Sequence, residues 1–293
     1  MPDYKRQHYL PTAYLKYFSA DQDRCSRDSL VWRVDKKTQR CVPILSQCFG
    51  DYLYSKESPV EAEKSFHRSE VKYTKCIDKI RSGIEPNAKN WGDLVLAMFD
   101  LHLRNGIHKN ETGKEGIYAY NQRSHIFLSQ ILLMSNKAEI TQSEIATHIE
   151  SYWHVKIVQA PPKHQFVTSD HPSMWTTLRK TTADSRPSLD LITLPISPTH
   201  TAVAFDKRVL DVIGTQATVR DEGTLNVGQV SNAENCIYLS QQLQEESLER
   251  IRSHFAQKSD SECKTDENGW ALILQHLPCE NYFSFMRLKP PLL

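Results

Sequence analysis

The stretch FVTSDHP, residues 166–172, passes from apolar residues directly into four hydrogen-bonding side chains and a proline. Phe, Val and Thr favour a strand, whereas Ser, Asp and Pro favour a turn, so we expect a buried strand to end here. A strand end that presents Asp170 and His171 is a candidate functional site. The alternative is that Thr168, Ser169 and Asp170 bond only the nearby backbone and shape the turn.

Strand-like patterns surround this stretch in the second half of the chain. They cover residues 153–158, 165–168, 189–196, 201–205 and 235–239. Most connections between them are too short for crossover helices, which predicts a largely antiparallel sheet. A further pattern of alternating residues predicts a hairpin over residues 30–45, and another is expected over 270–288.

Helical patterns dominate the first half of the chain. The expected helices cover residues 11–18, 59–82, 90–105, 117–134 and 141–152, and later ones cover a short stretch around 224–229 and residues 241–257. Pro59 suits a first helical position and Gly83 a helix end. The prediction is an α+β fold, with a mainly helical half (1–152, including the first hairpin) packed on a β-rich half (153–293) in one intimate globular unit.

Composition limits the location and partners of the protein. The chain of 293 residues carries 36 Lys or Arg against 35 Asp or Glu, so no global field favours nucleic acid or a membrane surface. The longest apolar runs, such as 94–99, are too short to cross a bilayer, and the N-terminus lacks a hydrophobic signal region. Seven scattered cysteines without a C-x-x-C pair fit free thiols. We expect a cytoplasmic protein without membrane contact.

Gln7 and His8 precede the first predicted helix, because Pro11 suits its first position. The positive end of the helix dipole disfavours an imidazolium ion, so a buried His8 would be neutral and able to exchange a proton. The alternative is a histidine that only packs and satisfies a backbone group.

Two charged residues fall on apolar helix stripes. Glu70 lies between Phe66 and Tyr73 at helical spacing, and Arg104 follows Leu101 on the next helix. A buried carboxylate without a partner is costly, so Glu70 needs a cation, a metal or a bound proton. A Glu70–Arg104 pair would satisfy both residues, and it could equally be a purely structural ion pair. Asn226 either reaches the region of Asp170 or caps a local turn.

Together these motifs resemble an uncharacterised bacterial family, the domain of unknown function 4238. The resemblance rests on QHYLP (7–11), on Glu70, on His102-Leu103-Arg104 and on FVTSDHP, and it continues loosely to about residue 240. It implies a helical N-terminal half packed on a β-rich C-terminal half, and a role in bacterial defence against phage. It also implies that His8, Glu70, Arg104 and Asp170 gather in one pocket.

The first functional hypothesis is an enzyme, a hydrolase or nuclease that acts on nucleic acid or a nucleotide. His8 would be the general acid or base, Asp170 would orient it, Glu70 would be a second carboxylate and Arg104 would bind phosphate. The substrate-binding candidates are Gln7, Ser169, His171 and Asn226. A variant of this hypothesis has a divalent metal held by Glu70, Asp170 and His8.

The second hypothesis is a non-enzymatic sensor or interaction protein. The same polar residues would bind a phage-derived trigger or a nucleotide, or would only fix the two halves together. The sequence leaves the cofactor, the substrate and the oligomeric state open.

Overall fold

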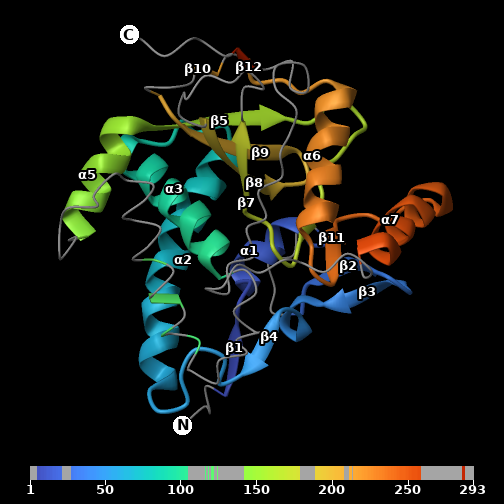
Figure 1. The fold of residues 1–293 in the computed structure, drawn as a ribbon, viewed down its shortest axis with the longest axis horizontal. Coiled ribbons are helices and arrows are strands. Elements are labelled where there is room, and N and C mark those ends of the chain that lie inside the picture. Colours follow the sequence, from blue (N-terminus) through green and yellow to red (C-terminus); the bar gives the residue numbers. More distant parts are fainter. Residues whose placement is uncertain are drawn as a thin grey trace, which may run out of the picture. The chain divides into compact units, whose positions relative to one another are not determined.

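The structure is a computed structural model. It describes residues 5–21, 28–104, 116, 118, 120, 121, 124, 142–178, 189–207, 211–212, 214–258 and 286–287. Figure 1 draws the chain as a ribbon coloured along the sequence, with its helices and strands labelled. Contacts within the chain group it into two compact units. Unit 1 comprises Met1–Ala13 and Gln47–His154, and unit 2 comprises Tyr14–Ser46 and Val155–Leu293.

Unit 1 is built around helices. Its long helix α2 (Pro59–Arg81) packs on α3 (Ala88–Leu103), which in turn packs on α5 (Gln142–Tyr152). Two short strands, β1 (Arg6–His8) and β4 (Phe49–Asp51), pair antiparallel. Gly83, at a φ of 69° that favours glycine, follows the end of α2. The Asn87 side chain accepts a hydrogen bond from the Asn90 N–H and caps α3.

Unit 2 contains two four-stranded sheets. The first has the order β3 (Gln39–Pro43), β2 (Leu30–Asp35), β11 (Cys236–Leu239), β6 (Thr168–Ser169). The second has the order β5 (Trp153–Gln159), β9 (His200–Asp206), β8 (Leu189–Ser197), β7 (Met174–Leu178). A small pair joins β10 (Asp211–Val212) to β12 (Met286–Arg287).

The helical parts of unit 2 pack against the first sheet. Helix α6 (Val219–Asn232) contacts β6 and β11, and α7 (Glu245–Lys258) contacts α6 and β2. Their shared core joins Val34, Val167, Val230, Ala233, Ile237, Leu239, Leu248 and Phe255. Short helical turns complete the structure: α1 (Thr12–Leu15), η1 (Lys16–Phe18) and η2 (Ile44–Ser46). Each fully buried aliphatic or aromatic side chain contributes roughly 1.5–3 kcal/mol of transfer free energy.

The structure confirms a mixed α+β fold. The expected helices near 59–82, 90–105 and 241–257 and the hairpin at 30–45 are present as α2, α3, α7 and β2–β3. Strands also occur near the N-terminus, so the division into a helical first half and a β-rich second half is only partly right. The hairpin groups with unit 2 because β2 pairs with β11. That the whole chain is one intimate unit stays a prediction.

Gln7 and His8 precede the first helix α1, as expected, and they lie in the strand β1, because their backbone pairs with Gly50 and Phe49. Two local predictions need correction. The strand expected over 165–168 is reduced to Thr168–Ser169, since the Phe166 N–H bonds Pro198 and the Val167 N–H bonds a side chain. The short helix expected around 224–229 is the longer α6, opened by a capping box between Thr218 and Asp221.

Two predicted elements lie largely outside the described residues. These are the helix at 117–134 and the hairpin at 270–288, of which the structure describes single helical positions and the strand β12, respectively. Within the described part of the chain, no helix combines the length and apolar character needed to cross a membrane.

Candidate functional site: two polar clusters

Arg104 is buried in unit 1, at the end of α3. Its side chain is 1% exposed, so its charge depends on protein partners rather than on water. Nη2 lies 2.7 Å from Asp100 Oδ2, one helical turn back, and Nη1 lies 3.5 Å from Glu70 Oε1 on α2. The predicted contact between Glu70 and Arg104 is therefore confirmed, and Asp100 is a closer partner that the prediction missed.

Aromatic rings enclose the guanidinium. Its Cζ lies 3.9 Å from the centroid of the Phe66 ring and 6.0 Å from that of Tyr54, distances at which a ring face attracts a cation. The Tyr120 hydroxyl donates a 2.6 Å hydrogen bond to Asp100 Oδ1. We call these six residues the Arg104 cluster; they are Tyr54, Phe66, Glu70, Asp100, Arg104 and Tyr120.

The electrostatics of the Arg104 cluster favour one cation beside protonatable carboxyl groups. Burial raises the pKa of Glu70, and Arg104 opposes that rise without cancelling it. Glu63, two turns earlier on α2, also has a raised pKa because of burial and the nearby Glu70. Burial lowers the pKa of Arg104, but Asp100 and Tyr54 outweigh it, and the net pKa lies above the ordinary value. Arg104 is thus charged, and the pKa of Glu70 lies above its ordinary value.

Two nitrogen atoms of Arg104 lack a hydrogen-bond acceptor in the described part of the chain. Among the described residues, its Nε finds no acceptor, and the short contact of Nη2 with Asp100 lacks hydrogen-bond geometry. A buried donor without an acceptor costs about 1–3 kcal/mol. The unused donors of a guanidinium fit the oxygens of an anionic ligand, such as a phosphate or a carboxylate.

Gln7 supports the Arg104 cluster from β1. Its Oε1 accepts hydrogen bonds from the N–H groups of Tyr54 (2.6 Å) and Ser55 (3.4 Å). Its Nε2 donates to the Ser55 and Pro59 carbonyls at 3.5 and 3.4 Å. The fully buried Gln7 side chain therefore holds the segment that presents the Tyr54 ring and leads into α2. This contact gives Gln7 a positioning role, and substrate binding by Gln7 stays a prediction.

His8 lies next to Gln7 in β1 and is half-buried. Its ring centroid lies 5.7 Å from that of Phe49, and its carbonyl accepts a 3.4 Å bond from the Tyr54 hydroxyl. These contacts tie His8 to the same segment as Gln7. A proton-transfer role for His8 stays a prediction.

Asp170 belongs to unit 2 and is bound to distant backbone. Its Oδ1 accepts from the Glu234 N–H at 2.8 Å, and its Oδ2 accepts from the Asn235 N–H at 2.8 Å and the Asn235 amide at 3.2 Å. Asp170 thereby fixes the loop between α6 and β11, whose strand pairs with β6 beside it. These contacts differ from the local turn that the sequence also allowed, and a catalytic role of Asp170 stays a prediction.

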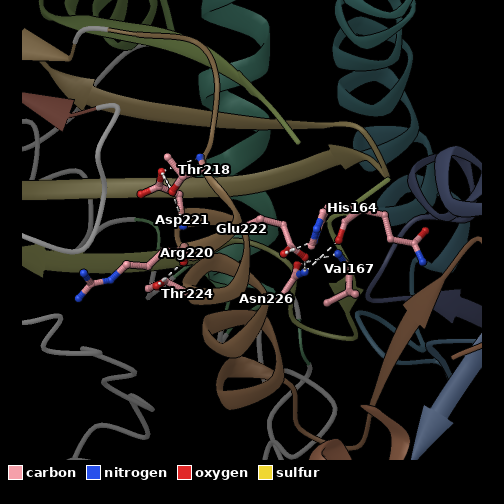
Figure 2. Close-up of polar contacts among 9 residues, drawn as sticks. His164, Val167, Thr218, Arg220, Asp221, Glu222, Thr224 and Asn226 are labelled. Atoms are coloured by element: carbon pink, nitrogen blue, oxygen red, sulfur yellow. Dashed lines mark hydrogen bonds and ion pairs between the residues drawn. The ribbon is translucent and has the colours of Figure 1, made fainter. Parts of the chain in front are cut away.

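Three amide side chains on one face of α6 bind the FVTSDHP stretch. Asn226 accepts from the Val167 N–H at 2.9 Å and donates to the Gln165 carbonyl at 2.9 Å (Figure 2). Gln229 donates to the Pro172 carbonyl at 2.8 Å, and Asn232 donates to the His171 carbonyl. Asn226 therefore reaches the stretch that leads to Asp170 rather than capping a local turn, and substrate binding by Asn226 stays a prediction. With Asp170, these residues form what we call the Asp170 network, namely Asp170, Asn226, Gln229 and Asn232.

Ser169 and His171 also have partners in unit 2. The Ser169 hydroxyl donates to Gln229 Oε1 at 3.0 Å, and the buried His171 ring places Nε2 3.3 Å from Glu234 Oε2. The contacts of Gln229 and Asn232 with the FVTSDHP stretch were not predicted from the sequence. Their signal was an amide at every third position of a helix, N-x-x-Q-x-x-N over 226–232.

The eight predicted site residues thus fall into two groups. Glu70 and Arg104 meet in unit 1, where Gln7 and His8 also lie, while Ser169, Asp170, His171 and Asn226 lie in unit 2. A pocket shared by His8, Glu70, Arg104 and Asp170 stays a prediction. Among the described residues, no group of three or more His, Cys, Asp or Glu side chains is placed to hold a metal ion.

Comparison with known proteins gives a family. The family described as a protein of unknown function, DUF4238, matches residues 6–243. The chain belongs to the DUF4238 family. The DUF4238 match covers the Arg104 cluster and the Asp170 network alike. No curated protein matches the chain, and no solved structure does.

Proposed function

We propose that this DUF4238 protein is a bacterial anti-phage effector that hydrolyses a phosphoester bond in a nucleic acid or nucleotide. The observation that supports the proposal is the buried guanidinium of Arg104, which keeps unused donors beside a Glu70 carboxyl of raised pKa. Phosphoryl transfer needs a cation where negative charge develops and an acid for the leaving oxygen. Arg104 and Glu70 are suited to these two tasks.

The proposed access to Arg104 runs along Glu70. The Glu70 side chain is 19% exposed, whereas Arg104 and Asp100 are shielded at 1% and 10%. The Glu70 contact with Arg104 is also the longer one, at 3.5 Å against 2.7 Å for Asp100. An incoming phosphate would therefore displace Glu70 from the guanidinium while Asp100 keeps Arg104 in place.

In the proposed reaction, a water oxygen bonds to phosphorus and the bond from phosphorus to the leaving oxygen breaks. Arg104 stabilises the charge on the phosphoryl oxygens, and protonated Glu70 gives its proton to the leaving oxygen. His8 is the proposed acceptor of the water proton. The proposed partners are nucleic acid or a nucleotide as substrate and a phage product as trigger.

The Asp170 network supports a second candidate function, a non-enzymatic sensor of the same kind of ligand. Both Asp170 oxygens and the Asn226 amide already have protein partners, mostly main-chain groups. Such a network fixes a conformation and can serve recognition without chemistry. In that case, loss of function in variants would follow loss of stability.

Expression in bacteria tests the first proposal. Growth, total RNA and total DNA are compared for wild type, Glu70→Gln and Arg104→Lys, with and without phage infection, and Tm is measured on each purified protein. The matched controls are Glu61→Gln and Arg68→Lys, which are exposed positions on α2. We expect nucleic acid breakdown in wild type and both controls, and none in folded Glu70→Gln or Arg104→Lys. Breakdown that persists in Arg104→Lys would contradict the proposal, as would intact nucleic acid in infected wild-type cells.

A further inference from the structure

A histidine and a carboxylate face each other beside the FVTSDHP stretch. His164 Nδ1 lies 3.3 Å from Glu222 Oε2, and the Asn226 amide donates to Glu222 Oε1. Figure 2 shows Glu222 and Asn226 extending from one side of α6 towards His164 and Val167, while Arg220 and Thr224 lie on its other side. Glu222 and Asn226 are one helical turn apart, which places them on the same face.

The Glu222 carboxylate is fixed on both sides. Asn226, which donates to it, is itself held by the Val167 N–H and the Gln165 carbonyl, each at 2.9 Å. The Glu222 side chain is 11% exposed, and burial raises its pKa while the adjacent His164 lowers it. An immobile carboxylate on Nδ1 orients an imidazole and selects its tautomer.

The residue before His164 has a strained backbone conformation. Lys163 has a φ of 67°, in the left-handed region that side chains other than glycine rarely adopt. The His164 N–H closes the turn onto the Pro161 carbonyl at 3.0 Å. The His164 side chain is 39% exposed, and among the described residues its Nε2 makes no hydrogen bond. Strain of this kind is more frequent at functional sites than elsewhere.

We propose that His164, oriented by Glu222 and Asn226, is a general base for hydrolysis of an anionic phosphoester at the surface of unit 2. The Nδ1–H donated to Glu222 leaves the lone pair on the accessible Nε2. Exposed Lys163, adjacent in the chain, supplies positive charge that favours an anionic substrate over a neutral one. The inference is independent of the function proposed for the Arg104 cluster.

In the proposed step, Nε2 takes a proton from water as the water oxygen bonds to phosphorus. The bond from phosphorus to the leaving oxygen then breaks, and Nε2 returns the proton to that oxygen. Glu222 accepts the Nδ1–H and stabilises the imidazolium that forms in between. Within this proposal His164 is the catalytic residue, and Glu222 and Asn226 are positioning residues.

The tautomer of His164 tests the orientation without requiring a substrate. Nitrogen-15 NMR of the wild-type protein should place the proton of neutral His164 on Nδ1 and the lone pair on Nε2. Glu222→Gln should lose this preference, while Arg104→Lys should keep it. A wild-type His164 that carries its proton on Nε2 would overturn the inference.

Hydrolysis of bis(p-nitrophenyl) phosphate tests the chemistry. Every protein in this test carries Arg104→Lys, so that the site proposed at the Arg104 cluster does not hydrolyse the probe. Relative to Arg104→Lys alone, adding His164→Gln should lower the rate about a hundredfold, and adding Glu222→Gln should lower it less. The control His200→Gln should leave the rate unchanged, because Nδ1 of His200 faces the hydroxyls of Ser197 and Thr199 rather than a carboxylate. Tm is recorded for every variant. Equal rates with and without His164→Gln in folded proteins, including the absence of hydrolysis in both, would overturn the inference whatever the tautomer.

Discussion

The Arg104 cluster and the Asp170 network both bury charge, but they satisfy it with different partners. Arg104 meets side chains, namely two carboxylates and two aromatic rings, and keeps donors unused. Asp170 meets two main-chain N–H groups and one side-chain amide, and both of its oxygens are engaged. Side-chain partners can rotate away for a ligand, whereas main-chain partners cannot leave without unfolding the loop. This difference is the reason why we propose ligand chemistry for the first region and a conformational role for the second.

The largest expected effect comes from removing the cation of the Arg104 cluster. Arg104→Met leaves Asp100 buried without its closest charge partner, and breaking a buried ion pair in this way costs about 3–5 kcal/mol. The free energy of unfolding in urea measures the loss. Arg68→Met, at an exposed position of α2, is the control and should change stability by about 0.5 kcal/mol or less. A loss below about 1 kcal/mol in Arg104→Met would mean that Arg104 and Asp100 do not form a buried ion pair.

The next effect should come from the Asp170 network. Asp170→Ala deprives the Glu234 and Asn235 N–H groups of their acceptors, which should cost about 3 kcal/mol. The exposed Asp51, paired with Lys5 at 3.0 Å, offers the control Asp51→Ala, whose loss should stay below about 1 kcal/mol. If both variants lose the same small amount, the bonds to residues 234 and 235 do not fix the loop.

The contacts of the Arg104 cluster could be predicted in part from the spacing of apolar residues along its helices. Glu70 and Arg104 stood on apolar stripes, and helical spacing alone places such residues at a helix interface. Asp100 could have been found as well, because it precedes Arg104 by four residues on the same helix.

The contacts of the Asp170 network could not be predicted in this way, because they join segments that lie far apart in the sequence. Asp170 reaches residues 64 and 65 positions away, and it does so only because β6 pairs with β11. The strand β1, which contains Gln7 and His8, was not predicted for a similar reason: its partner strand, Phe49–Asp51, is three residues long and has no pattern of its own. Neither arrangement has a signal within a short window of sequence.

Removing a neutral hydroxyl contact in unit 2 should cost less stability than removing the charged Asp170 carboxylate. The Tyr14 hydroxyl lies 2.7 Å from Thr168 Oγ1 and donates to the Pro195 carbonyl at 2.5 Å. Burial raises the pKa of Tyr14 far above its ordinary value, so the hydroxyl is neutral. Tyr14→Phe should therefore cost about 1 kcal/mol in urea unfolding, well below Asp170→Ala. A cost equal to that of Asp170→Ala would remove the distinction between neutral and charged contacts.

The smallest effect concerns pH. The pKa of Glu70 is raised in the folded protein, so its contribution to stability is fully present below its ordinary value of 4.5 and is lost as pH rises through the folded value. Glu70→Gln cannot ionise, so the stability of wild type relative to this variant should fall as pH rises from 4.5 towards neutrality. Urea unfolding at several pH values measures the trend, with Glu61→Gln as the control. A trend of the opposite sign would mean that Arg104 lowers the pKa of Glu70 below 4.5.

The contrast between the two regions is tested most directly by measuring Tm and nucleic acid breakdown together in two conservative variants, Arg104→Lys and Asp170→Asn. Lysine keeps the charge of Arg104 but lacks the guanidinium fork, so we predict a folded protein that no longer degrades nucleic acid. Asparagine cannot accept both N–H bonds that Asp170 receives, so we predict that Tm and activity fall together. An Asp170→Asn protein with wild-type Tm and no activity, or an active Arg104→Lys protein, would contradict the account.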